Sequence, residues 1–268
     1  MRKHKDTDYL FLSSYLHARE ARPGEAGSET DKAVILRDLE ELAPDPKIVD
    51  FFRVKYDYHN AKVFLKSIAA NTDNSRLYSP LGRIAPEQLM LAYRDGKSDK
   101  LPPAFAKAFL QADEVLSRTK DPRQADFLLD KAYVEELKET ADSTGAKLLI
   151  QYAALNADAL NLRALVRMLK SGVEPEELGK VLTDCGTVSL KALTAVYPDI
   201  PSALALYRST GLASLLPEAE KAARGGGFSA FEQDCRSLLA GWMDRARLTP
   251  FGEDVLIRYL YRLEAKEV

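Results

Sequence analysis

Hydrophobic residues along most of this chain recur with the three- and four-residue spacing of an amphipathic α-helix. Two segments show the pattern most clearly, with apolar residues at i, i+3, i+4 and i+7: Ala61, Phe64, Leu65 and Ile68 in one, and Leu162, Leu165, Val166 and Leu169 in the other. No run of alternating apolar and polar residues between turn signals predicts a hairpin. The pattern therefore predicts an all-α protein.

Proline and glycine mark where further helices begin and end. A helix is predicted over 124–141, after Asp121-Pro122, and a last helix after Thr249-Pro250. Three stretches read as loops or connectors between helices: 23–30, 95–103 and the three glycines 225–227.

A polar motif is superimposed on the two clearest helical segments. Residues 57–66 and 158–167 both read Asp-x-x-Asn-x-basic-x-apolar-apolar-basic, 101 positions apart. The matching polar residues are Asp57, Asn60, Lys62 and Lys66 in the first copy and Asp158, Asn161, Arg163 and Arg167 in the second. Downstream of each copy lies a Pro-acidic-polar-Leu helix start, at Pro86 and Pro175. Such repetition indicates structural units that stack or are arranged around an axis.

Asp and Asn are typical of helix starts, where their side chains accept hydrogen bonds from unpaired backbone N–H groups. We therefore interpret Asp57, Asn60, Asp158 and Asn161 as caps in the first turn of each motif helix, with the basic residues sharing a second face. The alternative is that the motif forms an interface with a partner. Loss of partner binding without loss of stability on substituting Asn161 would favour that alternative.

Composition narrows the classes of function. The chain has 268 residues, with 38 Lys and Arg against 40 Asp and Glu, so its formal net charge is -2. Near balance argues against nucleic acid as the main partner, since phosphate binding needs a basic surplus. Two cysteines, Cys185 and Cys235, predict buried thiols and a reduced, cytoplasmic setting. No apolar stretch approaches the roughly 20 residues that cross a bilayer, so direct membrane insertion is not expected.

Residues suited to catalysis or metal binding are sparse. His4, His17 and His59 are scattered without metal-ligand spacing, and the second motif copy has Leu160 where the first has His59. The glycines at 225–227 lack the Lys-Ser/Thr of a phosphate-binding loop. We accordingly predict no catalytic, cofactor-binding or metal-binding residues and no enzymatic activity on this chain.

Three ordered blocks resemble the C subunit of V/A-type ATPases, a family that includes the d subunit of the eukaryotic vacuolar enzyme. The first block is 56–66 and carries the first motif copy. The second runs from Leu129-Asp130-Lys131-Ala132-Tyr133 to 158–163. The third comprises 251–254 and 259–267.

The resemblance implies quasi-repeated helical domains arranged as a funnel around a pseudo-threefold axis. It implies a non-catalytic central-stalk subunit that joins the rotor shaft to the membrane ion-carrying ring and transmits torque for ATP-coupled proton or sodium transport. The expected partners are the central-shaft subunits and the ring, and the expected place is the cytoplasmic face of the membrane. The predicted domains are 1–46 with 244–268, 47–120 and 121–243.

Both ends of the chain depart from the family pattern. Members normally continue past the last block into a third copy of the motif. Residues 6–11 resemble the first helix of the family, but members have further helices between that helix and the segment that corresponds to residues 36–44 here. Since both ends build one domain in this family, we expect that domain to be incomplete. An alternative function is therefore a free-standing helical scaffold that kept the fold without the rotor role.

Overall fold

A computed structural model of the chain describes residues 4–20, 28–245 and 249–265. Within these ranges the secondary structure is helical and contains no strand, which confirms the all-α prediction. The chain folds into two compact units. Unit 1 comprises residues 1–149 and 248–268, and unit 2 comprises residues 150–247.

Unit 1 holds both ends of the chain and the first motif copy. Its helices are a 3-10 turn η1 (Asp6–Tyr9), α1 (Leu10–Glu20), α2 (Glu29–Leu42), α3 (Lys47–Ala70), α4 (Pro86–Asp95), α5 (Pro103–Thr119), α6 (Pro122–Thr144) and α13 (Glu253–Ala265), with short 3-10 turns η2 (Ser75–Leu77) and η3 (Ser98–Lys100). Helix α6 contains the whole of the predicted 124–141 segment, and α13 is the predicted last helix.

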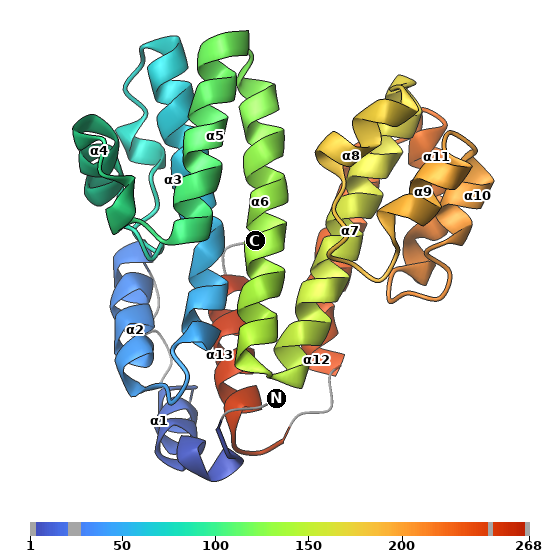
Figure 1. Cartoon of the computed structure of the whole chain (residues 1–268). Coiled ribbons are helices and arrows are strands. Elements are labelled where there is room, and N and C mark those ends of the chain that lie inside the picture. The colour runs from blue at the N-terminus through green and yellow to red at the C-terminus, as the bar shows by residue number, and fades with distance from the viewer. Residues whose placement is uncertain (1–3, 21–27, 246–248, 266–268) are drawn as a thin grey trace. The chain divides into compact units, whose positions relative to one another are not determined.

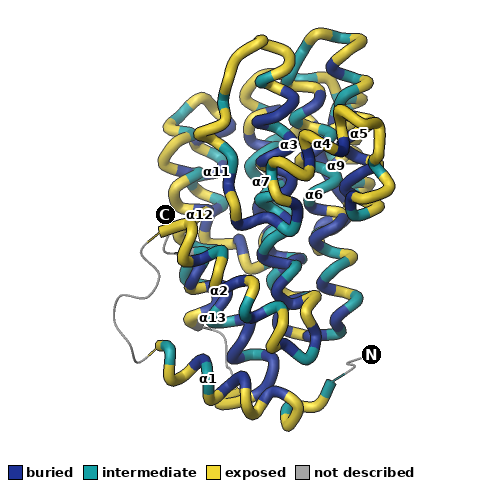
Figure 2. The backbone as a smooth tube through the Cα atoms, turned by 90° about the vertical axis from the view of Figure 1, so that its left-hand side faces the viewer, coloured by how far each residue is buried: buried dark blue, intermediate teal, exposed yellow. Residues whose placement is uncertain are grey.

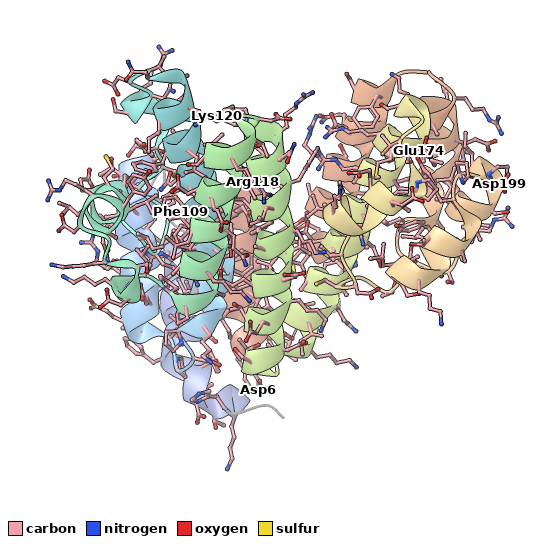
Figure 3. The ribbon with its side chains drawn as sticks, turned by 45° about the horizontal axis from the view of Figure 1, so that its top comes forward. Asp6, Phe109, Arg118, Lys120, Glu174 and Asp199 are labelled. Atoms are coloured by element: carbon pink, nitrogen blue, oxygen red, sulfur yellow. The ribbon has the colours of Figure 1, made fainter. Side chains whose placement is uncertain are left out.

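The long helices α3, α5 and α6 pack alongside one another and build the centre of unit 1 (Figure 1). Aromatic side chains fill the space between α3, α4 and α5. Phe109 of α5, labelled in Figure 3, is 1% exposed. It lies against Phe64, Tyr93 and Phe105, and the ring centroids within this cluster are 5.0 to 6.0 Å apart. Such aromatic contacts add to the stabilisation from buried apolar area.

The two ends of the described chain meet in unit 1. Helix α13 packs on both α1 and α3, and the backbone N–H of Gly252 donates to Ser13 Oγ at 3.3 Å. Arg262 and Glu20 form an ion pair at 3.4 Å. The boundary predicted at residue 120 separates α5 from α6, which pack on each other within this unit. The division into three domains stays a prediction.

Unit 2 contains the second motif copy in a long helix followed by shorter ones. They are α7 (Lys147–Ser171, whose first three residues belong to unit 1), η4 (Pro175–Glu177), α8 (Leu178–Val181), α9 (Leu190–Val196), α10 (Ile200–Ala205), η5 (Ala213–Leu215), α11 (Leu216–Ala223) and α12 (Phe228–Arg245). Leu162, Leu165 and Val166 are fully buried in its core. The three glycines at 225–227 connect α11 to α12, as predicted.

Buried and exposed positions alternate along the helices with helical period (Figure 2). Ala61, Phe64 and Leu65 are buried as their spacing predicts. Ile68 is 44% exposed, because α3 ends two residues later. Of the polar loop predicted at 23–30, residues 23–27 lie outside the described residues, and Ser28 caps α2 by accepting from the N–H of Asp31 at 3.1 Å.

Candidate functional site

The motif residues do not cap helices, and that interpretation is wrong. Asp57 and Asn60 lie in the middle of α3, which begins at Lys47, and Asp158 and Asn161 lie in the middle of α7, which begins at Lys147. Helix α3 begins ten residues upstream of Asp57 because the apolar residues there are buried with the same helical period: Ile48, Val49, Phe51, Phe52 and Val54. The motif side chains are therefore available to bind another part of the chain.

Each motif asparagine binds the backbone of a loop that follows its helix. Asn60 donates from Nδ2 to the carbonyl of Ser79 at 2.9 Å, and its Oδ1 accepts from the N–H of Ser79 at 2.9 Å. Asn161 makes the same pair of hydrogen bonds with Thr183, at 2.8 and 3.0 Å. All of these groups are buried, and each pair satisfies one backbone donor and one backbone acceptor.

Each motif aspartate binds the same loop further along. Oδ1 of Asp57 accepts from the N–H of Ile84 at 3.1 Å, and Oδ1 of Asp158 accepts from the N–H of Val188 at 3.2 Å. A glycine lies against the carboxylate in both cases. A Cβ added at Gly82 or Gly186 would collide with Oδ1 of the neighbouring aspartate, so the close approach requires glycine.

We call residues 79–84 motif loop 1 and residues 183–188 motif loop 2. They share Ser or Thr at the first position, Gly at the fourth and Ile or Val at the sixth. A helix follows each loop directly, α4 from Pro86 and α9 from Leu190. Pro175 begins η4, which precedes motif loop 2, so the two Pro-acidic-polar-Leu starts are not equivalent as the sequence suggested.

The basic residues of each motif pair with acids on the helix packed alongside. Lys62 pairs with Asp130 of α6, and Lys66 pairs with Asp126 at 2.7 Å. In unit 2 both arginines bind one acid: Arg163 and Arg167 lie 2.8 and 2.5 Å from Glu232 of α12. The eight motif residues thus form two similar clusters, each joining one helix to its own loop and to a neighbouring helix.

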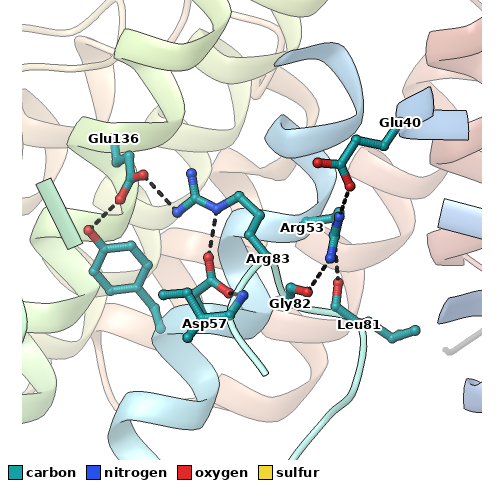
Figure 4. Close-up of polar contacts among 9 residues, drawn as sticks. Glu40, Arg53, Asp57, Leu81, Gly82, Arg83 and Glu136 are labelled. Atoms are coloured by element: carbon teal, nitrogen blue, oxygen red, sulfur yellow. Dashed lines mark hydrogen bonds and ion pairs between the residues drawn. The ribbon is translucent and has the colours of Figure 1, made fainter. Parts of the chain in front are cut away.

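Arg83 of motif loop 1 is the centre of a buried ionic cluster with residues of α3 and α6 (Figure 4). Arg83 donates from Nε to Oδ2 of Asp57 at 2.6 Å, and its NH2 group lies 2.8 Å from Oε1 of Glu136 on α6. The hydroxyl of Tyr58 donates to Oε2 of Glu136 at 2.8 Å. Burial raises the pKa of Asp57 to about 6, although Arg83 and the N–H of Ile84 oppose the shift. Burial, with the charge of Glu136, also raises the pKa of Tyr58.

A second arginine, Arg53 of α3, also binds motif loop 1. Arg53 donates to the carbonyl of Leu81 at 3.3 Å and to that of Gly82 at 2.5 Å, and it also pairs with Glu40 of α2 (Figure 4). A guanidinium group suits this place because its planar set of donors can serve two carbonyls and a carboxylate together.

Motif loop 2 lacks both arginines. Thr187 stands where Arg83 stands in loop 1, and its hydroxyl donates to Oδ2 of Asp158 at 2.5 Å while its N–H donates to Oδ1 at 2.9 Å. Counting back four residues from the aspartate, Ala154 stands where Arg53 stands in α3. A groove of about 760 Å³ adjoins Asp158, Thr187 and Ala154.

The other predicted features lie away from the motif loops or inside the core. His59 contacts the carbonyl of Leu77 through Nε2 at 2.8 Å, and His4 lies 3.8 Å from Asp8. The thiols of Cys185 and Cys235 are buried, as predicted. Across the described ranges, no three His, Cys, Asp or Glu residues gather in a way that could hold a metal ion.

Sequence reasoning missed the loop half of each motif. The residues concerned are Arg53, Ser79, Gly82, Arg83 and Glu136 in unit 1, and Thr183, Gly186 and Thr187 in unit 2. The shared Ser/Thr-x-x-Gly-x-Ile/Val pattern was a usable signal. It was hidden because Ser79 follows Asn60 by 19 residues whereas Thr183 follows Asn161 by 22.

A long helix binds its own downstream loop through an asparagine and an aspartate, and this arrangement occurs twice, so the chain is a repeat protein of two related helix–loop units. The family model described as ATP synthase (C/AC39) subunit matches residues 29–266, and the chain belongs to that family. The C subunit of the V-type sodium ATPase of Enterococcus hirae is 22% identical over 164 residues. That alignment covers 61% of this chain and 50% of the relative, so the chain spans about half the length of the curated relative it matches.

Proposed function

We propose that this chain is a non-catalytic central-stalk subunit of a V/A-type rotary ATPase. In this role it joins the rotor shaft to the membrane ion-carrying ring and transmits torque during ATP-coupled transport of protons or sodium ions. The observation that carries the proposal is the match of the C/AC39 family to residues 29–266. The similarity to the C subunit of the E. hirae sodium ATPase supports the same assignment.

The motif clusters support a role without chemistry on this chain. Both oxygens of Asp57 and of Asp158 accept hydrogen bonds from groups of their own loop. Carboxylates held in this way are not poised to take a proton from a substrate, since a general base needs a lone pair directed at its target. The clusters instead stiffen each helix–loop unit, which suits a part that passes on torque.

We further propose that the chain works on the cytoplasmic face of the membrane through contacts with other subunits. None of the helices that the structure describes has both the length and the apolar character needed to span a bilayer. The proposed partners are the central-shaft subunits and the rotor ring. The proposed arrangement is a funnel of helical domains around a pseudo-threefold axis.

The test is co-elution of the purified chain with the central-shaft subunits in size exclusion, with the membrane ring tested in a separate run. A stable complex with the shaft is the expected result. Circular dichroism before each run shows that the chain is folded and helical, and a heat-unfolded sample is the negative control. Failure of a folded chain to bind either partner would overturn the proposal in favour of a free-standing scaffold.

A further inference from the structure

The buried cluster at motif loop 1 has more negative than positive charge. Arg83 contacts two carboxylates at once, that of Asp57 on α3 at 2.6 Å and that of Glu136 on α6 at 2.8 Å. These two residues are 1% and 7% exposed, so bulk water does little to compensate their charges. With both carboxylates ionised, one guanidinium group offsets one of two buried negative charges. An unpaired buried charge is costly, so the cluster favours a proton that neutralises one carboxylate.

The surplus of acid extends to the residues around these three. Arg53 of α3 pairs with Glu40 of α2, so the charge of that arginine is offset within its own pair. Asp50 of α3 adds a further carboxylate that interacts with Arg83 and Glu136, and burial raises the pKa of Asp50 although Arg83 opposes the shift. Positive charge from these neighbours therefore does not make up the deficit.

The other helices packed on α3 bring no compensating cation to the cluster. Two further ion pairs flank it along α3, and each is balanced in itself: Lys55 with Glu264 of α13, and Lys62 with Asp130 of α6. Helices α4 and α5 meet α3 through aromatic rings, and the ring of Phe105 on α5 lies 5.3 Å from that of Tyr58.

A proton on Asp57 would weaken one contact of Arg83 and leave the other unchanged. Oδ2 of Asp57 accepts from the Nε–H of Arg83, and Oδ1 accepts from the N–H of Ile84. A hydrogen bond between a guanidinium group and a carboxylate is strong because both partners are charged, and a neutral carboxyl group does not provide this strength. Glu136 remains available on the other side of Arg83, at a separate nitrogen of the guanidinium group.

We propose that Arg83 is a pH-dependent switch in motif loop 1, which links α3 to α6 while Asp57 is ionised and is held by Glu136 of α6 alone once Asp57 takes up a proton. Burial raises the pKa of Asp57 to about 6, so Arg83 links the two helices above about pH 6 and leaves α3 below it. Asn60 and Arg53 bind the loop through its backbone and keep it on α3 in both states. The proposal concerns unit 1 and does not require the rotor role.

Two-dimensional ¹H–¹⁵N NMR of the full chain gives a direct test. The Nε–H of Arg83 and the backbone N–H of Ile84 both donate to Asp57, so both resonances report on its carboxyl group. Over a titration from about pH 8 to about pH 4.5, both should shift with one midpoint near pH 6. The Arg83 proton should move to lower chemical shift on acidification, as expected for a weakened hydrogen bond. In Asp57→Asn this transition should be absent, because the group that takes up the proton is gone.

Variants on α6 then test whether the two carboxylates compete for Arg83. Glu136→Gln keeps the shape of the side chain but leaves Arg83 to Asp57 alone, so the midpoint should fall by ~0.5 pH unit or more, a roughly 3-fold lower proton affinity. Glu135→Gln is the matched control, since Glu135 is the adjacent and exposed acid on the same helix. It should leave the midpoint within about 0.2 pH unit, because exposed charges are screened by salt. Circular dichroism melts show whether each variant is folded.

Three outcomes would overturn the proposal. A parent chain without a transition in this range would show that Asp57 does not take up the proton. A shift of the Ile84 N–H without one of the Arg83 Nε–H would show that the arginine does not leave Asp57. Equal midpoints for Glu136→Gln and Glu135→Gln would show that the carboxylates do not compete. If Glu136→Gln failed to fold, the parent chain and Asp57→Asn would still decide the first two.

Discussion

Motif loops 1 and 2 are held by the same asparagine and aspartate contacts, but different side chains bind the buried aspartate in each loop. In both loops an asparagine binds the backbone of the first residue and an aspartate binds the backbone of the sixth. The glycine at the fourth position lies against that aspartate. Loop 1 neutralises its carboxylate with Arg83 and shares that arginine with Glu136 on α6. Loop 2 relies on neutral donors from Thr187 and Val188 and borders an open groove.

One part of the repeat holds the loop backbone and is the same in both loops, whereas the groups that face the aspartate differ. Backbone N–H and C=O groups of a buried loop need partners in every copy, so the Asp, Asn and Gly positions repeat. The aspartate accepts from a charged donor, Arg83, in loop 1 and from neutral donors, Thr187 and Val188, in loop 2, so the arginine positions differ.

The largest effect is expected from Arg83→Met, which keeps the volume but leaves Asp57 and Glu136 buried without their cation. Breaking a buried ion pair in this way costs about 3–5 kcal/mol of unfolding free energy. The matched change in loop 2, Thr187→Val, removes one hydroxyl donor and should cost about 1 kcal/mol. Urea unfolding measures both. Equal losses would show that the ionic cluster is not what separates the two loops.

Next in size, Asn60→Ala and Asn161→Ala should each cost about 2–4 kcal/mol, because each leaves a buried backbone donor and acceptor unpaired. Similar losses of unfolding free energy for the two variants would show that the asparagine–loop contact has the same role in both units. Ser189→Ala is the control, since Ser189 is a true helix cap that accepts from the N–H of Ala192, and its loss should cost about 1 kcal/mol. A loss for Asn161→Ala no larger than that for Ser189→Ala would contradict the loop-holding role.

A smaller effect concerns pH. The pKa of Asp57 is raised to about 6, above the value of 3.8 for an ordinary aspartate, so between these values the folded state binds the proton more readily than the unfolded chain. The unfolding free energy from this group therefore falls as pH rises from about 4 to about 6. Relative to Asp57→Asn, the parent chain should gain about 1 kcal/mol on going from pH 7 to pH 5. Parallel profiles for the two proteins would contradict this.

The smallest effect is expected at the outer basic residues. Arg167 is 59% exposed, and Glu232 keeps Arg163 as a partner when Arg167 is removed. Arg167→Ala should therefore cost no more than about 0.5 kcal/mol, as is usual for exposed pairs, and the loss should shrink in high salt. Thermal melts at two salt concentrations measure it. A loss above that of Thr187→Val would place Arg167 in a larger network.

Much of the fold was predictable from periodicity alone. Leu162, Leu165 and Val166 are buried where their spacing placed them, and α6 and α13 follow their proline signals. The repeated polar residues were also found. Their role as caps was wrong, because the apolar residues before Asp57, such as Ile48, continue the helix and remove the need for a cap there.

The loop half of the site could not be paired from the sequence by simple spacing. Insertions in loops cost little free energy, so the distance from Asn to its loop partner changed from 19 to 22 residues while the contact stayed the same. Glu136 is more distant still: it lies 78 residues from Tyr58, to which it is hydrogen-bonded, and nothing local marks it.

The sequence by itself determined the helical class, the family and the existence of two related units, because these depend on local periodicity and on residue order. Only the tertiary structure decided what the repeated Asp and Asn bind, which acids the basic residues meet, and that one loop is closed by arginines while the other borders a groove. These are contacts between residues about 20 to 80 positions apart in the chain. They form only when packing brings together helices that the chain order keeps apart.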